Sequence, residues 1–585
     1  VCPAFIPAGP PTADPTLRQV SSTAEIQGEA VRMRSNGGWA RCAVMGAGLA
    51  WGGIAAAAAP PTESTAQAPA LPAQLQDFDA YVEGVRKQFD VPGIAVAIVK
   101  DGHVVLERGF GVRELEKDSR GRPQPVDAHT LFAIASNTKA FTSASLSILA
   151  DEGKLSLDDR VIDHLPWFRM SDPYVTREMR VRDLLAHRSG LGLGAGDLLY
   201  WPGTDYSTQE VARRLRDVPL TGGFRSQYAY DNILYGVAQL VIEQVSGQSY
   251  EEFLRARILR PLGMNETRFN SDALKPGDNV ATGYAKADFK DLQPAPRMSW
   301  GNVSGAGGLY SSVHDMSRWM SMQLAGGMYR DAKGTQVSLF SEKRQQEMWS
   351  VVTPMPIAKP TVPQLEPVRP NFLGYGEGWQ LSDYRGQKLV WHTGGWPGMV
   401  SRLTLVPSKK LGVIVLTSAE LSGAFNAVTM RVLDAYLDAP RTDWNAAYAA
   451  ALAKSRDKAD EDWQKHQKAR AADSRPSLPL ADYARTYRDP WYGDVVIEQR
   501  GDKLVMRFSH TRQLVGELSH WQHDTFIVRW DERWLNADAF VTFALDADGA
   551  IREARMEAIS PLTDFSFDFH DLRLAPQKPQ SGSGS

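Results

Sequence analysis

The stretch FAIASNTKAFTSASLSILA, residues 132–150, places a serine and a lysine at the head of an almost unbroken apolar run. Ser136 and Lys139 stand three residues apart, and a lysine is expensive to bury. Residues three apart share one face of a helix, so the Lys139 amine can approach the Ser136 hydroxyl. The stretch therefore predicts a buried helix that carries a serine–lysine pair.

The same spacing occurs a second time, at Ser455 and Lys458 in KSRDKADED, where charged neighbours indicate a solvated helix face. Two fixed residues at a fixed gap are expected roughly once or twice by chance in a long chain of ordinary composition. The serine–lysine spacing alone therefore establishes no function, and the rest of the chain has to supply the context.

The composition is that of a soluble globular protein with more than one domain. A chain of 585 residues is too long for a single hydrophobic core. The net charge of −3 gives no reason to expect nucleic acid or an anionic membrane as a partner. The sequence shows no metal-ligand spacing of histidines, no phosphate-cradling glycine motif and no G-x-S-x-G elbow. No metal or other cofactor is therefore predicted.

The N-terminal part of the chain predicts targeting rather than a folded domain. Residues 33–59 combine a short basic start, an Ala/Gly-rich apolar segment and small residues before a proline, which is typical of a secretory signal peptide. A membrane anchor is the alternative, although the segment is barely long enough to span a bilayer. Residues 1–32 are interpreted as upstream translation. Cys2 and Cys42 both precede the cleavage site, so the mature protein would have no disulfide.

Composition and periodicity divide the rest of the chain into five segments. Residues 60–76 predict a flexible linker. In residues 77–437 strand-like runs at both ends flank a helical middle, which favours an α+β fold. Its first and last strands would pair in one antiparallel sheet, flanked by helices and a helical lobe. Residues 438–475 predict a helical linker, residues 476–575 a small antiparallel barrel or sandwich, and residues 576–585 a flexible tail.

Two later motifs supply partners for Ser136 and Lys139. Tyr230 and Asn232 belong to YDN, the only Y-x-N in the chain, and HTG, residues 392–394, ends a strand-like run. Burial lowers the pKa of a lysine, so that a neutral amine can take the serine proton. Tyr230 can relay that proton to the leaving group, and Asn232 can hold a substrate amide. A helix that begins at the serine would also direct backbone N–H groups toward a developing oxyanion.

The ordered set SxxK, YxN and HTG resembles the serine β-lactamase and penicillin-binding-protein superfamily. The chain is similar to its branch of class C β-lactamases, D-aminopeptidases, D-Ala-D-Ala carboxypeptidases and β-lactamase-like esterases. Segments such as VRDLLAHRSGL and GAGGLYSSVHDMSRWM extend the resemblance over residues 77–437. The resemblance implies a β-lactamase/transpeptidase-like fold. Some family peptidases append a lipocalin-like barrel, which shapes the active-site entrance or assembles a homo-oligomer. The C-terminal region of this chain resembles such a barrel.

The resemblance also implies a role for each motif residue. Ser136 would be the acylated nucleophile, Lys139 its proton acceptor and Tyr230 the general acid/base. The backbone N–H groups of Ser136 and Gly395 would form the oxyanion hole. The residues implied to bind substrate come from the second and third motifs: Asn232, His392, Thr393 and Gly394.

One departure from the family pattern bears on the substrate. The β-lactamases of this branch usually carry a lysine where His392 stands, whereas a histidine is mostly neutral at pH 7. The peptidase and esterase members fit that residue better. A second histidine, His187 in LLAHRSGL, is interpreted as structural.

The predicted function is that of a bacterial serine hydrolase, secreted or periplasmic, which cleaves amide bonds in small peptides, D-residue-containing peptides included. A carboxylesterase with the same machinery is the alternative, and a β-lactamase or a non-catalytic penicillin-binding sensor is a weaker one. The expected partners are a small peptide, amide or ester substrate and further copies of the chain. Nucleic acid and stable membrane insertion after signal cleavage are not expected.

Overall fold

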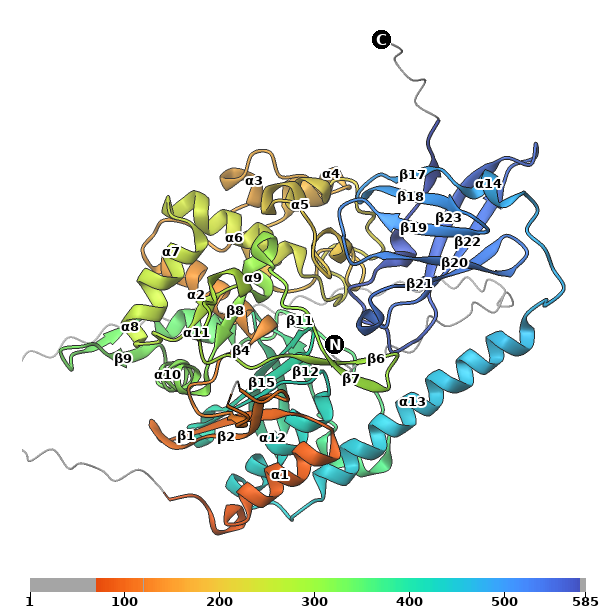
Figure 1. Cartoon of the computed structure of the whole chain (residues 1–585). Coiled ribbons are helices and arrows are strands. Elements are labelled where there is room, and N and C mark those ends of the chain that lie inside the picture. The colour runs from red at the N-terminus through yellow and green to blue at the C-terminus, as the bar shows by residue number, and fades with distance from the viewer. Residues whose placement is uncertain (1–69, 119, 579–585) are drawn as a thin grey trace, which may run out of the picture. The chain divides into compact units, whose positions relative to one another are not determined.

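The computed structural model describes residues 70–118 and 120–578 of the chain (Figure 1). The predicted signal peptide and the residues before it lie outside the described residues, as do most of the 60–76 linker and most of the C-terminal tail. The search for helices both long and apolar enough to cross a membrane finds none among the described residues.

A nine-stranded antiparallel sheet forms the centre of the larger domain. The strands are, in order across the sheet, β11 (Thr353–Pro354), β12 (Leu373–Tyr375), β13 (Gln380–Tyr384), β14 (Gln387–Trp396), β15 (Met399–Val406), β16 (Leu411–Thr417), β1 (Gly93–Lys100), β2 (His103–Glu114) and β3 (Gln124–Pro125). The first long strand pairs with the last, with Val96 opposite Val415. The predicted pairing of the first and last strand-rich parts of residues 77–437 in one sheet is therefore confirmed.

Both faces of this sheet are covered. The apolar residues of β1 do not alternate with polar ones, because its side chains are buried on both faces. Val96 packs in one hydrophobic cluster with the terminal helices α1 (Phe78–Gln88) and α12 (Ser422–Tyr436). The next residue, Ala97, packs in the other cluster, with α10 (Val313–Leu324) and the helical lobe. Because successive side chains of a strand point to opposite faces, a strand covered on both sides reads as one continuous apolar run.

The helical lobe surrounds α2, the buried helix that the opening stretch predicts. The lobe helices are α2 (Thr138–Asp151), preceded by the short turn η2 (Ala135–Asn137), α3 (Val161–His164), α4 (Pro173–Glu178), η4 (Asp197–Leu199), α5 (Thr208–Arg214), α6 (Ile233–Ser246), α7 (Tyr250–Leu254), α8 (Arg260–Leu262), α9 (Ser304–Gly307) and α11 (Glu342–Met348). Every residue of α2 before Asp151 is buried, because α6, α7, α9 and α11 pack around it.

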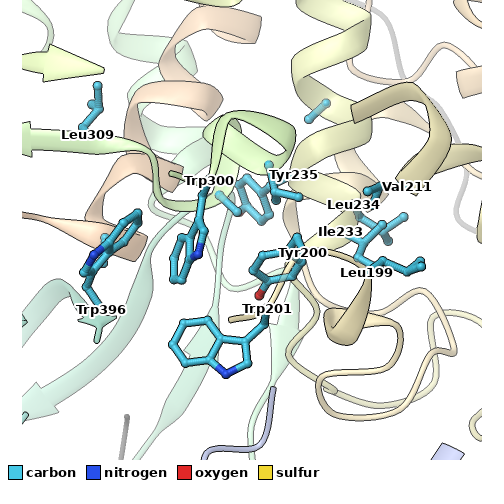
Figure 2. Packing of buried hydrophobic residues seen from close by; sticks show 14 of the residues in the cluster. Leu199, Tyr200, Trp201, Val211, Ile233, Leu234, Tyr235, Trp300, Leu309 and Trp396 are labelled. Atoms are coloured by element: carbon cyan, nitrogen blue, oxygen red, sulfur yellow. The ribbon is translucent and has the colours of Figure 1, made fainter. Parts of the chain in front are cut away.

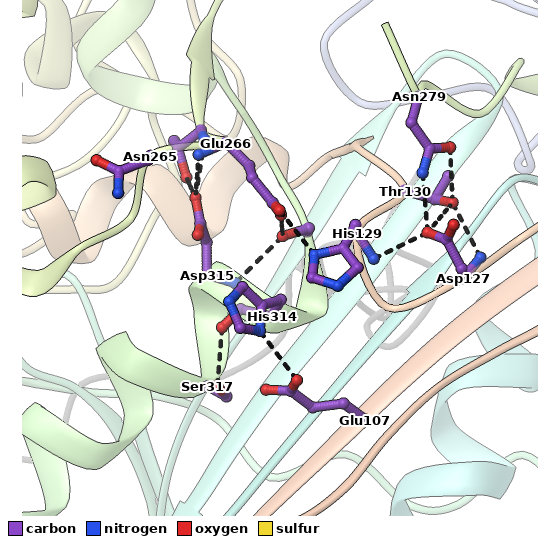
Figure 3. Close-up of polar contacts among 12 residues, drawn as sticks. Glu107, Asp127, His129, Thr130, Asn265, Glu266, Asn279, His314, Asp315 and Ser317 are labelled. Atoms are coloured by element: carbon purple, nitrogen blue, oxygen red, sulfur yellow. Dashed lines mark hydrogen bonds and ion pairs between the residues drawn. The ribbon is translucent and has the colours of Figure 1, made fainter.

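Short strands and a polar network position the chain just before α2 (Figure 3). The short strands are β4 (Phe132–Ala133), β8 (Leu309–Ser311) and β5 (Arg268–Phe269) in one sheet, and the pairs β6 (Tyr284–Ala287) with β7 (Asp291–Pro294) and β9 (Met328–Arg330) with β10 (Gln336–Ser338). Ahead of β4, the Asp127 carboxylate accepts hydrogen bonds from the Thr130 hydroxyl at 3.0 Å and the Asn279 amide at 2.8 Å. These contacts hold the segment that leads into η2.

The C-terminal region is a nearly closed antiparallel barrel, as predicted. Its strands are, in order, β23 (Ile551–Ala558), β22 (Ala539–Leu545), β21 (Thr525–Trp530), β20 (Val515–Gln522), β19 (Lys503–Phe508), β18 (Gly493–Arg500), β17 (Thr486–Asp489) and β24 (Ala575–Pro576). A bridge between Ala554 and Leu574 brings the two ends of the sheet together. Alternate residues of β19 point into the barrel core, namely Leu504, Met506 and Phe508. The lipocalin-like character of the barrel stays a prediction.

A 26-residue helix, α13 (Trp444–Ala469), joins the two domains within the segment expected to be a helical linker. The Asp443 side chain caps its first turn by accepting a hydrogen bond from the Ala446 N–H at 3.0 Å. The Trp444 indole N–H donates to the Asp434 carboxylate of α12 at 2.7 Å, which anchors the helix to the sheet domain. A short helix, α14 (Leu480–Tyr483), then precedes the barrel.

Candidate active site

Ser136 lies in η2, in a turn whose backbone is held by the sheet. Ala135, the residue before it, has a φ of +46°, a left-handed conformation that costs a non-glycine residue about 1–3 kcal/mol. Strand β14 lies against this turn, and a Cβ on Gly394 would overlap the carbonyl oxygen of Ile134. The Ser401 hydroxyl of β15 donates to the same carbonyl at 2.8 Å. The glycine of the HTG motif is therefore a packing requirement of the serine turn.

The Lys139 amine is fully buried and lies within hydrogen-bond distance of three oxygens. Its Nζ is 3.0 Å from the Ser136 hydroxyl, 2.7 Å from the Asn232 amide oxygen and 3.0 Å from the Ala306 carbonyl. The last two oxygens can only accept hydrogen bonds. A neutral amine, with two hydrogens and one lone pair, satisfies both and turns its lone pair to Ser136. The geometry is therefore that of a base placed against a serine hydroxyl.

Tyr230 lies just before α6, beside the lysine. Its ring centroid is 4.8 Å from Lys139 Nζ, and the ring of His187 packs against it at 4.2 Å. His187 is fully buried, and its Nδ1 accepts a hydrogen bond from the Asp231 backbone N–H at 3.2 Å. Burial lowers the pKa of His187 well below its usual value, so the ring is neutral. His187 supports the tyrosine from behind, in keeping with its structural interpretation.

Asn232 bridges the lysine to a buried carboxyl group. Its amide oxygen accepts from Lys139, and its amide nitrogen donates to Asp197 Oδ2 at 2.8 Å. Burial raises the pKa of Asp197 to about 7. The structure thus brings Ser136, Lys139 and Asn232 into one hydrogen-bonded chain. Contact between Asn232 and a substrate stays a prediction.

His392 is buried in β14, and both of its ring nitrogens are engaged. Nδ1 is 2.6 Å from the Thr393 carbonyl, which can only accept, so Nδ1 carries the hydrogen. Nε2 then accepts from the Tyr375 hydroxyl at 2.8 Å. Burial lowers the pKa of His392 to about 3. A neutral, doubly hydrogen-bonded imidazole supports the strand and is not placed to carry a proton.

The rest of the third motif lies along β14. Thr393 is opposite Arg402 and Gly395 is opposite Val400 in the pairing with β15. Gly395 is partly exposed, whereas residues 389–394 before it are buried. The predicted oxyanion hole at Ser136 and Gly395, and the substrate contacts of Thr393 and Gly394, stay predictions.

An aromatic cluster adjoins the end of β14, and the motifs gave no sign of it (Figure 2). The ring of Trp300 packs at 3.9 Å from that of Trp396 and at 5.0 Å from that of Trp201. Tyr200 meets Trp300 edge-on at 5.6 Å, and Phe567 of the C-terminal region meets Trp201 at 6.0 Å. The cluster therefore combines side chains of the lobe, the sheet and the barrel region.

Sequence reasoning also missed the polar residues that support Lys139 and Asn232. These are the Ala306 carbonyl, Asp197, and two residues of the C-terminal region, Ser566 and Asp568. Only one signal could have drawn attention to the last two. The run DFSFDFHD, residues 564–571, alternates acidic or polar residues with phenylalanine without forming a strand of the barrel. Among the described residues, no group of three or more side chains suited to a metal ion is found.

Fold and site together define the class of this protein as a serine hydrolase. Residues 78–437, more than half of the chain, match the family model described as Beta-lactamase. The chain belongs to the beta-lactamase family. Residues 469–576 match a separate domain of unknown function, DUF3471, which contains the barrel.

Two known proteins are similar to the chain in sequence. It is 28% identical over 461 residues to the protein named Unguisins hydrolase ungD' of Aspergillus campestris, covering 72% of this chain and 77% of that protein. It is 26% identical over 344 residues to Protein flp of Staphylococcus aureus, covering 59% and 63%.

Two solved structures share the fold. The octameric penicillin-binding protein homologue from Pyrococcus abyssi aligns with a TM-score of 0.53 and 22% identity, over 86% of this chain and 99% of that one. The D-amino acid amidase from Ochrobactrum anthropi aligns with a TM-score of 0.50 and 23% identity, over 62% of this chain and 99% of that one. Because the first covers both domains, its fold includes the counterpart of the barrel region.

Proposed function

We propose that this serine hydrolase cleaves amide bonds of small peptides, D-residue-containing peptides included, through an acyl-enzyme on Ser136. Lys139 and Tyr230 act as acid and base. The observation that carries the proposal is the environment of Lys139 Nζ, which lies 3.0 Å from the Ser136 hydroxyl and within hydrogen-bond distance of two acceptor oxygens. In the neutral amine, the form that can accept a proton, two hydrogens satisfy those oxygens and the lone pair faces Ser136.

The acylation step follows from this geometry. Lys139 takes the proton of the Ser136 hydroxyl as its oxygen attacks the substrate carbonyl carbon, which becomes tetrahedral with a negative oxygen. Backbone N–H groups of Ser136 and Gly395 would stabilise that oxygen. The C–N bond then breaks, and Tyr230 passes the proton to the departing amine nitrogen. The acyl group remains on Ser136.

Deacylation reverses the proton movements. Water attacks the acyl carbonyl and gives one proton to the Lys139–Tyr230 pair. The bond between the carbonyl carbon and the Ser136 oxygen breaks, and that oxygen recovers the proton. The carboxylic acid product leaves, and the enzyme returns to its starting state.

Ester substrates would use the same groups, but an alkoxide leaves more readily than an amine. An amine needs a proton as it leaves, and Tyr230, 4.8 Å from Lys139 Nζ by its ring centroid, is suited to supply it. The name of one similar protein, a D-amino acid amidase, makes amide bonds the first to test. His392 brings no positive charge to the site, which argues against efficient β-lactam hydrolysis.

The test compares wild type, Ser136→Ala and the matched control Ser455→Ala on D- and L-aminoacyl amides, short peptides, p-nitrophenyl esters and a chromogenic cephalosporin. Wild type and Ser455→Ala should turn over amides, and mass spectrometry should find a fluorophosphonate adduct on Ser136. Ser136→Ala should lose at least about 10³-fold in kcat/KM. Activity retained in Ser136→Ala rejects the mechanism. Turnover of esters alone moves the proposal to an esterase.

Assembly and export belong to the same proposal. The similar protein from Pyrococcus abyssi is described as octameric, and we infer that this chain also forms a homo-oligomer through its barrel region. Light scattering on the purified chain, with and without residues 476–578, measures the number of copies. The export proposal rests on residues 33–59, and a periplasmic fraction that holds the chain cleaved after that segment would support it.

A further inference from the structure

A segment of the C-terminal region lies directly against the catalytic residues. The ring of Phe565 meets that of Tyr230 edge-on, with centroids 5.8 Å apart. Phe565 also packs so closely on Gly194 that a Cβ at that glycine would lie 2.6 Å from the Phe565 carbonyl oxygen. Residues 564–568 are therefore part of the wall of the site rather than a distant attachment.

The same segment holds Asp197 from two directions. The Ser566 hydroxyl donates to Asp197 Oδ2 at 2.8 Å. The Asp568 carboxyl accepts hydrogen bonds from the backbone N–H groups of Gly196 and, at 3.1 Å, of Leu198, the two neighbours of Asp197 in the chain. Both the side chain and the backbone of Asp197 are thus fixed by residues more than 360 positions later in the sequence.

Asp197 in turn decides which way the Asn232 amide faces. The oxygen and nitrogen of an asparagine amide have nearly the same shape, so only hydrogen-bond partners distinguish the two orientations. Asp197 Oδ2 accepts hydrogen bonds from the Ser566 hydroxyl and from the Asn232 nitrogen. With its nitrogen held there, Asn232 must present its oxygen to Lys139, at 2.7 Å. A flipped amide would instead place N–H groups against the lysine and push its hydrogens toward Ser136.

The charge of the cluster does not disturb this arrangement. Asp197 and Asp568 are both fully buried, and burial raises the pKa of each carboxyl, that of Asp197 to about 7. The charge of Asp197 raises the pKa of Asp568 further, well above its usual value. Among the described residues Asp197 Oδ1 has no hydrogen-bond partner, so a proton on Oδ1 leaves Oδ2 able to accept from both the Ser566 hydroxyl and the Asn232 nitrogen. The orientation of Asn232 is therefore kept.

We propose that Asp197 is a positioning residue of the hydrolase site, which orients Asn232 so that Lys139 can act as the base for Ser136, and that barrel-region residues Ser566 and Asp568 hold Asp197 in place. The inference rests on the proposed function, because it acts on Ser136 through Lys139. It makes the C-terminal region a component of the catalytic site and not only a means of assembly.

The experiment measures the rate at which a fluorophosphonate labels Ser136 in the full-length chain, because labelling reports serine reactivity whatever the natural substrate. Asp197→Ala should label about 10–100 times more slowly than wild type, and Ser566→Ala about 3–10 times more slowly. Asp197→Asn keeps an acceptor oxygen and should recover part of the rate. The control Ser560→Ala removes a hydroxyl that lies four residues before Asp564 and accepts a hydrogen bond from the Leu562 N–H. The labelling rate of this control should stay within about twofold of wild type.

Double variants separate positioning from a general loss of structure. If Asp197 acts through Asn232, then Asp197→Ala should change the labelling rate by less than about twofold in an Asn232→Ala background. Equal slowing in both backgrounds, or wild-type labelling of Asp197→Ala, overturns the inference while leaving the Ser136 proposal intact. If Asp197→Ala fails to fold, the labelling rate of Ser566→Ala decides the question, provided that its Tm is unchanged. Slower labelling supports the inference, and labelling at the wild-type rate overturns it. No labelling of Ser136 in wild type overturns both proposals.

Discussion

The chain contains the same serine–lysine spacing in two helices, and the two pairs have opposite surroundings. In α2, Lys139 is fully buried and shares its amine among Ser136 and two further oxygens. In α13, the Lys458 side chain is 56% exposed and pairs with Asp462, one turn along the same helix. Ser455 donates to the Ala451 carbonyl at 3.0 Å, also in its own helix, and makes no hydrogen bond to the lysine among the described residues.

The difference lies in what other parts of the chain bring to the pair. Asn232, from the start of α6, and Ala306, from α9, supply the oxygens that hold the Lys139 amine. The exposed pair finds its partners within one turn of α13, and its lysine is free to point to solvent. A serine and a lysine at helical spacing therefore become a reactive pair only where separate elements bury the amine and direct its hydrogens away from the serine.

Replacement of each lysine tests this contrast most strongly. Lys139→Ala should lower kcat/KM by about 10³-fold or more, because the Ser136 hydroxyl loses its base. Lys458→Ala should stay within about twofold of wild type, since it removes one exposed ion pair. Steady-state kinetics on the best amide substrate measures both. Comparable losses in the two variants would mean that burial of the lysine is not what distinguishes the pairs.

Two glycines test whether the sheet holds the serine turn. Gly394→Ala should destabilise the protein by about 1–3 kcal/mol and reduce Ser136 labelling, because the added Cβ overlaps the Ile134 carbonyl. Gly84 lies on the exposed side of α1 with nothing near its Cβ position, so Gly84→Ala should stabilise the helix by about 0.5–1 kcal/mol. Urea unfolding measures both free energies. A neutral Gly394→Ala variant would contradict the close packing of β14 on the turn.

The last prediction concerns the acid stability of the buried site. His392 has a pKa of about 3 in the folded protein and about 6.5 when unfolded. Between these values the unfolded state binds a proton that the folded state does not, so stability is fully present above pH 6.5 and is lost as the pH falls toward 3. His392→Gln removes this contribution. Its free energy of unfolding should fall less steeply than that of wild type between pH 6.5 and 4.5. Parallel slopes would show that His392 is not held neutral.

The features that the sequence predicted well are those written in a local pattern. The apolar run after Ser136 is α2, the valine-rich runs near residues 96 and 415 are paired strands, and the alternating runs after residue 476 form the barrel. Three ordered motifs were enough to predict that Ser136, Lys139 and Asn232 lie together. The helices and strands follow from residues a few positions apart, where periodicity limits the outcome, whereas their pairing followed from the simplest packing of the domain and the grouping of the motifs from the family resemblance.

Contacts between distant segments could not be predicted in this way. Asp197, the first residue of η4 after a glycine-rich loop, has no motif, and its importance depends on Asn232 on one side and Ser566 on the other. The histidine of HTG is recognisable in the sequence, yet its role depends on Tyr375, which leaves neither ring nitrogen free. A residue's partners across the fold follow from the packing of whole elements, and no local spacing records them.

By itself, the sequence determined the elements, their order and the candidate nucleophile, because hydrophobic periodicity and motif spacing act over short stretches of chain. Only the tertiary structure decided which oxygen atoms contact the Lys139 amine, and that residues 565–568 reach the site. Those outcomes depend on hydrogen bonds and exclusion of water between elements far apart in the chain. Such long-range contacts gave Lys139 its buried place beside Ser136 and left Lys458 in solvent.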